Sequence, residues 1–430
     1  MDREPFDPLA YRDPTPSPGL IRSLDPLNRR LLLPFVMKVR GIDLPAADEQ
    51  RLRAAVRPDT AAFLGPNHPE FLTDWLLDKE IARRAAPRMA HWASREIVNR
   101  SSLEQAFWLK NNLIANVPGG RGKEYSVQWA IAGHGVLLHP EGHPTWHPGH
   151  VGPLLPGIAD MAWESARVLE RMMRKTPVYI VPIVWWLRFT RDAAPGLHRE
   201  MAHLEEALGL ADGRTLSLEK RFESLHWAIL LRRRESFGFL GPVGKSALPP
   251  HDFFDAQCTF STVLLDILES RFGTQQGDLA DKLHGLRRAI RMQWKEDPES
   301  VRVDRKRLRE VERLQHFQRA LYDKETLMQE EIAASLKQLR GALLPGEVFR
   351  NMVPIAVAPR IAHIRVLEPI EVRGRAAQSD EAAAKAAMLS ELRARMQAGL
   401  DALDAELNAR RPPKRHSNPL WTRKQRAAAS

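Results

Sequence analysis

The chain has 430 residues, of which 43% are hydrophobic and 27% charged, so it is long enough to bury a sizeable core in one domain or two. Its single cysteine, Cys258, excludes an intramolecular disulfide and fits a reducing compartment. The net charge of +11 favours an anionic partner, either lipid headgroups or nucleic acid.

The N-terminal part of the chain contains a leader and then a basic apolar segment. Residues 1–20 are rich in proline and aspartate, which predicts a flexible leader and is not typical of a signal peptide. No apolar run approaches the ~20 residues that a membrane-spanning helix needs. Residues 21–39 alternate apolar residues with arginine and lysine. This pattern predicts either an amphipathic helix lying on a bilayer or a core helix broken at Pro34.

Residues 63–77 read as a buried strand, a turn and a helix. The apolar run stops at Gly65-Pro66, turns through Asn67-His68-Pro69 and resumes as a periodic segment rich in leucine and tryptophan. An imidazole at such a junction titrates near neutrality and suits a catalytic base, and the Asp74 carboxylate lies about one helical turn further on. The alternative is a capped helix in which both side chains only satisfy local backbone groups.

Two further strands are indicated downstream. Residues 136–142 read Val-Leu-Leu-His-Pro-Glu-Gly, an apolar run that ends at a proline and a glycine. Residues 177–184 form another apolar run that is bounded and interrupted by prolines.

Histidine is dense around the first of these strands. Five histidines fall within seventeen residues: His134, His139, His143, His147 and His150. Imidazoles at such short spacing suit a transition metal, but the intervening prolines forbid a regular helix and no cysteine lies nearby. We therefore expect no metal and interpret the segment as a substrate-lining or structural loop. A metal-dependent hydrolase built on this loop is the alternative.

The order of these blocks resembles that of the phospholipid/glycerol acyltransferase superfamily, which contains lysophosphatidate and glycerol-3-phosphate acyltransferases. The resemblance covers roughly residues 30–190 and resumes at about residue 353. The blocks are Asn67-His68, Asp74-Trp75-Leu76-Leu77, Pro140-Glu141-Gly142 and the strand at 177–184. It implies an α/β fold with a mixed sheet flanked by helices. It also implies transfer of a fatty acyl group from acyl-CoA or acyl-carrier protein to a lysophospholipid or glycerol-phosphate-type hydroxyl, with no cofactor besides the thioester co-substrate.

The resemblance assigns the general base to His68 and substrate binding to its neighbour Asn67. The family places four residues between the histidine and its aspartate, whereas five separate His68 from Asp74 here. Either Thr73 has replaced the acid or one residue has been inserted. We favour an insertion, because the Asp-Trp-Leu-Leu run matches what commonly follows the family's aspartate, and Glu70 is a third option. Without a carboxylate at His68, the protein would be a catalytically degenerate, membrane-binding relative.

The resemblance also suggests how an acceptor phosphate would be bound. Glu141 and Gly142 match the family's Pro-Glu-Gly block, and Arg121 is our candidate for the arginine that contacts the phosphate. The family continues that block with Thr-Arg-Ser, but this chain has Pro144 where the arginine would stand. His143 is the candidate substitute as a pH-dependent donor.

The rest of the chain suggests an insertion and a return to the first domain. We expect residues 21–190 to be the first part of the acyltransferase domain and residues 191–350, with their helical periodicity, to be a large helical insertion. Residues 351–409 would supply the last strands, including one at 353–358, and a C-terminal helix.

The last segment, residues 410–430, is basic around Trp421 and is expected to be a tail. Such a tail suits an anionic membrane surface, and non-specific RNA binding is the less favoured option. We expect a cytoplasmic protein held peripherally on the inner face of a membrane, with no specific nucleic-acid partner.

Overall fold

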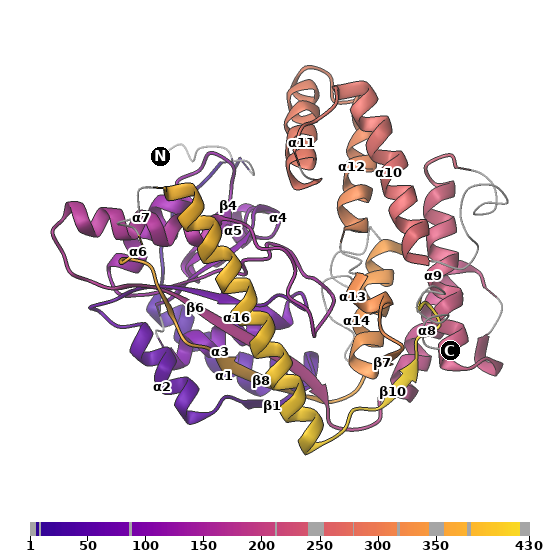
Figure 1. The fold of residues 1–430 in the computed structure, drawn as a ribbon, viewed down its shortest axis with the longest axis horizontal. Helices are drawn as coiled ribbons and strands as arrows, with labels where there is room; N and C mark the ends of the chain where they lie inside the picture. The colour runs from indigo at the N-terminus through magenta and orange to yellow at the C-terminus, as the bar shows by residue number, and fades with distance from the viewer. Residues whose placement is uncertain are drawn as a thin grey trace. The chain divides into compact units, whose positions relative to one another are not determined.

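The computed structural model describes residues 6–7, 10–85, 88–210, 213–239, 253–277, 279–315, 319–343, 357–375 and 380–421 (Figure 1). The chain divides into two compact units. Unit 1 comprises Met1–Arg191 and Met352–Pro412, and unit 2 comprises Asp192–Asn351 and Pro413–Ser430. Unit 2 therefore interrupts unit 1 in the sequence.

Unit 1 is built on a mixed sheet, as expected for an α/β protein. In the described part of the chain its strands are β1 (Val39–Asp43), β2 (Ala61–Pro66), β3 (Ala90–Ser94), β4 (Leu113–Asn116), β5 (Val136–Leu137), β6 (Val178–Phe189), β8 (Arg360–Val366) and β9 (Ile370–Glu371). The order is β1-β8-β6-β2-β5-β3-β4, with β9 also beside β6. Strands β6, β2, β5, β3 and β4 run parallel, while β8 and β9 are antiparallel to β6. The prediction of a mixed sheet flanked by helices is confirmed.

Helices cover both faces of this sheet. They are α1 (Pro18–Leu27), the π-helix η1 (Asn28–Val36), α2 (Ala46–Ala55), α3 (Thr73–Ala85), α4 (Arg95–Val98), α5 (Ser102–Lys110), α6 (Gly122–Ile131), α7 (Gly157–Arg171) and α16 (Glu381–Arg410). Residues from η1, α2 and α3 share one core with Val181, Ile183 and Trp185 of β6. Helix α7 and the long α16 also pack against β6 (Figure 1). Because β6 is buried along almost its whole length, its sequence is nearly continuously apolar.

The predicted strand, turn and helix around His68 are confirmed. Strand β2 is buried at every residue and ends at Pro66, and α3 begins at Thr73. His68 lies in the turn between them. Strand β2 is placed between β5 and β6, so this turn lies beside the segments that follow both neighbours.

The N-terminal prediction needs two corrections. The backbone amides of Thr15 and Ser17 donate to the carbonyls of Leu109 and Lys110, and α1 begins at Pro18, so the ordered part of the chain starts before residue 20. The helical segment also does not break at Pro34, because the chain has already changed to π-helical hydrogen bonding at η1. Across the described residues, every helix is too short or too polar to traverse a bilayer.

Unit 2 is mainly helical. It contains α8 (Ala194–Leu208), the 3₁₀ turn η2 (Gly213–Thr215), α9 (Leu218–Glu235), α10 (Phe253–Phe272), α11 (Leu279–Glu296), α12 (Arg302–Leu314), α13 (Arg319–Tyr322) and α14 (Gln329–Leu343). Strand β7 (Thr326–Met328) pairs antiparallel with β10 (Arg415–Ser417). Within the predicted basic tail, residues 415–417 are therefore part of a two-stranded sheet. Residues 422–430 and most of the strand predicted at 353–358 lie outside the described residues.

Candidate active site

Two histidines meet at one edge of the unit 1 sheet. His68 follows β2, and His139 comes two residues after β5, which pairs in parallel with β2. Because parallel neighbours end at the same edge of a sheet, the topology brings the two side chains together. Their rings are stacked, with centroids 4.2 Å apart and planes inclined by 20°.

Helix α3 supplies a carboxylate to each ring. Asp74 and Asp78 are four residues apart, so they lie on the same face of the helix. Asp74 Oδ2 is 2.8 Å from Nδ1 of His68, and Asp78 Oδ2 is 3.0 Å from Nε2 of His139. Asp74 Oδ2 is also 3.7 Å from Nε2 of His139. The site thus contains two histidine–aspartate pairs packed against each other.

Asp74 is the acid beside His68 among the three residues considered from the sequence. Glu70 instead forms an ion pair with Arg360, and the Thr73 hydroxyl accepts a hydrogen bond from the same guanidinium at 3.2 Å. Asp74 makes this contact to His68 through Oδ2. The other oxygen of Asp74 accepts the backbone N–H of Trp75 at 2.7 Å, so the carboxylate also caps its own helix.

His139 is the charged member of the site. Its Nδ1 lies 3.2 Å from the carbonyl oxygen of Pro66 and 3.1 Å from that of Asn67, and a carbonyl can only accept, so Nδ1 carries a hydrogen. Burial lowers the pKa of His139, but the carboxylates of Asp78 and Asp74 outweigh it and raise the pKa to about 9. Burial also raises the pKa of Asp78. We place the proton between the pair on Nε2 of His139, because this nitrogen faces the carboxylates of both Asp78 and Asp74.

His68, in contrast, is uncharged. Burial, and next the positive charge of the stacked His139, lower its pKa to about 4, although Asp74 acts to raise it. The ring is therefore neutral at neutral pH. With Nδ1 facing the carboxylate, the free lone pair is on Nε2. None of the residues that the structure describes hydrogen-bonds to Nε2, and 10% of the His68 side chain is exposed.

The loop after β5 fixes the backbone of His68. Glu141 accepts the N–H of His68 at 2.5 Å and that of Gly152 at 2.6 Å, while the N–H of Thr145 donates to the carbonyl of His68 at 2.8 Å. Burial raises the pKa of Glu141 to about 7. Gly142 has a φ of 72°, and a Cβ there would lie 2.3 Å from Leu155 Cδ1. The Pro-Glu-Gly block therefore supports the His68 turn through backbone contacts.

The other predicted residues lie at different distances from this centre. The Asn67 side chain is bonded to the backbone of Trp185 on β6, accepting at 2.9 Å and donating at 3.2 Å, so its amide holds two strands together. His143 is near enough that its charge also lowers the pKa of His68. Arg121 follows β4, three strands away from β2, where 67% of its side chain is exposed and it pairs with Glu124 at 3.1 Å. The structure does not bring Arg121 to His68.

Sequence reasoning missed Asp78 and the pairing of His139. The available signal was the spacing of four residues between the two aspartates, which predicts a shared face of α3. Nothing in the sequence shows that β5 lies beside β2. That adjacency, and therefore the stack of the two rings, follows from the tertiary fold.

The same side chains have the composition of a metal site. One ligating atom from each of His68, Asp74 and His139 lies within 4.8 Å of the others. His139 donates its second ring nitrogen to backbone carbonyls, as metal-bound histidines usually do. Oδ1 of Asp78 and Nδ1 of His68 are enclosed without a hydrogen bond. The arrangement therefore suits either proton transfer or metal binding.

A scan of protein-family models and a search of curated proteins find no match for this chain.

Proposed function

We propose that the protein is an acyltransferase that moves a fatty acyl group from acyl-CoA or acyl-carrier protein to a glycerolipid-type hydroxyl. The observation that supports this most is a neutral His68 at the end of β2, with Asp74 at 2.8 Å from one nitrogen and no described partner on the other. The resemblance of the ordered sequence blocks to the phospholipid/glycerol acyltransferases supports the same reaction.

In this proposal the acceptor hydroxyl gives its proton to Nε2 of His68. The hydroxyl oxygen attacks the thioester carbonyl carbon, the carbon–sulfur bond breaks, and the departing thiolate takes the proton from the imidazolium. The products are an ester and a free thiol, so no serine or cysteine nucleophile is needed. Asp74 stabilises the imidazolium that forms, which offsets the opposing charge of His139. General-base help of this kind contributes roughly 10²- to 10⁴-fold.

We also propose that the enzyme works on lysophospholipid or glycerol-phosphate acceptors at an anionic membrane surface, peripherally on the cytoplasmic face. The net charge of +11 supports a partner of this kind. Glu141, Gly142 and His143 lie on the loop beside His68 and would border the acceptor.

The test is to incubate the purified protein with acyl-CoA and a panel of lyso-acceptors and to identify the ester that forms. His68→Ala should reduce turnover by roughly 10²- to 10⁴-fold. His284→Ala, which removes an exposed histidine of unit 2, is the matched control and should leave turnover unchanged. Unchanged turnover in folded His68→Ala protein would remove the proposal. A folded protein that binds membranes and forms no ester would be the degenerate relative.

A metal-dependent hydrolase is a second candidate, favoured by the close ligating atoms of His68, Asp74 and His139. A metal on Nδ1 of His68 would place the ring hydrogen on Nε2, so His68 would no longer act as a base. The two candidates therefore exclude each other. Elemental analysis of the purified protein separates them: about one transition-metal ion per chain, lost in His139→Gln, supports the hydrolase, and metal-free protein that forms ester supports the acyltransferase.

A further inference from the structure

A cavity of about 660 Å³ lies on unit 1 between α1, η1 and α3. It is lined by Arg22, Asp25, Pro26, Arg29, Arg30 and Arg83. Four arginines against one aspartate make this lining positive. Asp25 supplies the one negative charge of this lining. The cavity therefore favours an anion.

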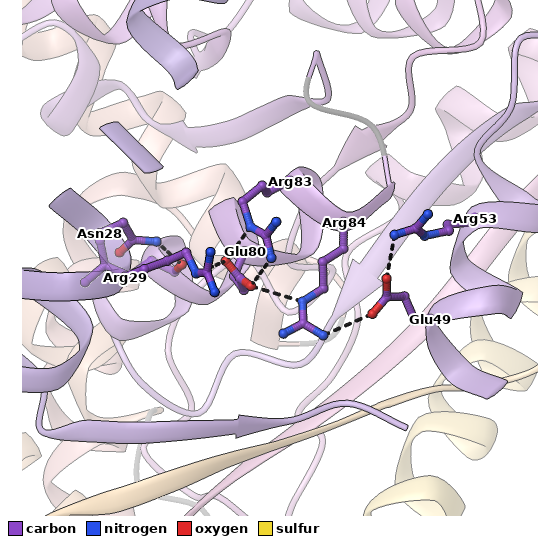
Figure 2. A network of polar contacts seen from close by, with 8 residues as sticks. Asn28, Arg29, Glu49, Arg53, Glu80, Arg83 and Arg84 are labelled. Carbon is purple, nitrogen blue, oxygen red and sulfur yellow. Dashed lines mark hydrogen bonds and ion pairs between the residues drawn. The ribbon is translucent and has the colours of Figure 1, made fainter. Parts of the chain in front are cut away.

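The arginines around this cavity outnumber the acids available to them. Figure 2 shows Arg29, Arg83 and Arg84 converging on Glu80, whose two oxygens already accept from Arg83 and Arg84 at 2.6 to 3.0 Å. Arg29 is left with a contact of 3.8 Å and keeps 56% of its side chain exposed. For Arg22 and Arg30, the described residues provide no acidic partner, and Arg22 bonds only to the carbonyl of Pro18 in its own helix. Their guanidinium groups are therefore available to a ligand.

Exposed apolar side chains lie on the same helical segment. Ile21, Asn28 and Leu33 face the core, and the side-chain amide of Asn28 donates to the carbonyl of Leu76 at 2.9 Å, which attaches the segment to α3. The outer residues are large and apolar: Leu27 is 42% exposed, Leu31 49%, Phe35 61% and Val36 39%. Leu27, Leu31 and Phe35 follow at intervals of four residues, so they succeed each other along one side.

We propose that this surface, defined by Leu27, Leu31, Phe35 and Val36 with the arginine-lined cavity, docks on a bilayer and holds the headgroup of an acidic phospholipid in the cavity. An amphipathic segment at an interface places leucine and phenylalanine at the acyl boundary and its arginines at the headgroup phosphates. The guanidinium of Arg40 lies 5.3 Å from the ring of the exposed Phe35, so a cation is also positioned beside this aromatic side chain. Charge complementarity selects an acidic bilayer as the occupant.

The test is sedimentation of the full chain with vesicles, without acyl donor or acceptor. Vesicles of phosphatidylcholine mixed with phosphatidylglycerol should bind the protein, vesicles of phosphatidylcholine alone should bind it more weakly, and high salt should weaken the binding. Arg22→Gln and Arg30→Gln should each reduce the affinity by about fivefold, the effect of one basic residue at an acidic surface. Leu31→Glu with Phe35→Glu should abolish binding.

Matched controls separate this surface from general charge and hydrophobicity. Leu103→Glu replaces an apolar residue of α5 that is 80% exposed, and Arg171→Gln removes a cation of α7 whose side chain is 62% exposed. Both should bind like the wild type, as should His68→Ala, which separates docking from acyl transfer.

The proposal is overturned if the arginine variants bind like the wild type, or if both lipid mixtures bind equally. It is also overturned if inorganic phosphate protects the cavity arginines while neither vesicle binds, because the cavity would then serve a soluble anion.

Discussion

The two histidine–aspartate pairs of unit 1 contain the same side chains at nearly the same distances, 2.8 Å and 3.0 Å, yet their rings differ in charge. His139 faces two carboxylates and donates its other nitrogen to carbonyls, so its pKa rises to about 9. Burial lowers the pKa of His68 to about 4; the stacked His139 cation adds to this effect, and the one carboxylate that His68 faces opposes it. Both rings are buried beside one carboxylate, so the comparison teaches that a further neighbour decides the charge of each: the second carboxylate beside His139 and the imidazolium beside His68. Only the neutral ring can accept a proton.

The largest difference between the pairs should be seen in their effect on turnover. Asp74→Asn removes the charge that stabilises protonated His68 in the proposed reaction, so we expect a loss of roughly 10²- to 10⁴-fold in kcat. Asp78→Asn, assayed in folded protein, should change kcat far less because Asp78 serves the other ring. Equal losses in the two variants would contradict separate roles for the pairs.

The second difference should be seen in stability. Asp78→Asn leaves the buried His139 imidazolium without its nearest counter-charge, which costs about 3 kcal/mol or more in free energy of unfolding at neutral pH. Asp74 faces a neutral His68, so Asp74→Asn should lower the free energy of unfolding by less. Chemical denaturation of the two variants measures both values. The opposite ranking would place the buried cation on His68.

The pairs should also respond to pH with opposite signs. His139 has a folded pKa of about 9, above its unfolded value of ~6.5, so its contribution to stability is complete below pH ~6.5 and is lost as pH rises toward 9. His68 has a folded pKa of about 4, so the unfolded state gains the proton first and stability falls as pH drops from ~6.5 toward 4.

Measuring the free energy of unfolding of wild type and His139→Gln across this range isolates the contribution of His139, which is the one lost at alkaline pH. The difference between the two proteins should shrink from pH ~6.5 to 9, and a difference that does not change over that range would show that His139 is not charged in the folded protein.

The smallest effect concerns the pH profile of acyl transfer. Because His68 stays neutral down to a pKa of about 4, the acid limb of kcat/KM should lie well below pH 6.5. His139→Gln removes the stacked cation and should move that limb to higher pH. Kinetics with a saturating donor test this, and movement to lower pH would show that His139 does not act on His68 through its charge.

Much of unit 1 could be predicted from the sequence, because its signals are local. The apolar run before Pro66 and the periodicity after Thr73 give the strand, the turn with His68 and helix α3 without knowledge of any distant residue. The alanine-rich composition of residues 379–409 also predicts the C-terminal helix of unit 1, in which a residue such as Met388 or Leu392 is buried every three or four positions.

The sequence by itself determined that His68 stands in a turn between a buried strand and the helix that carries Asp74, because the apolar run and the periodicity after it are local signals. Only the tertiary structure decided that β5 lies next to β2, which stacks His139 on His68 and gives Asp78 its partner. The charge of each ring depends on burial and on groups distant in sequence, and so does the exposure of Phe35 beside an arginine-lined cavity. Such quantities arise when separate segments pack together, and no pattern within one segment encodes them.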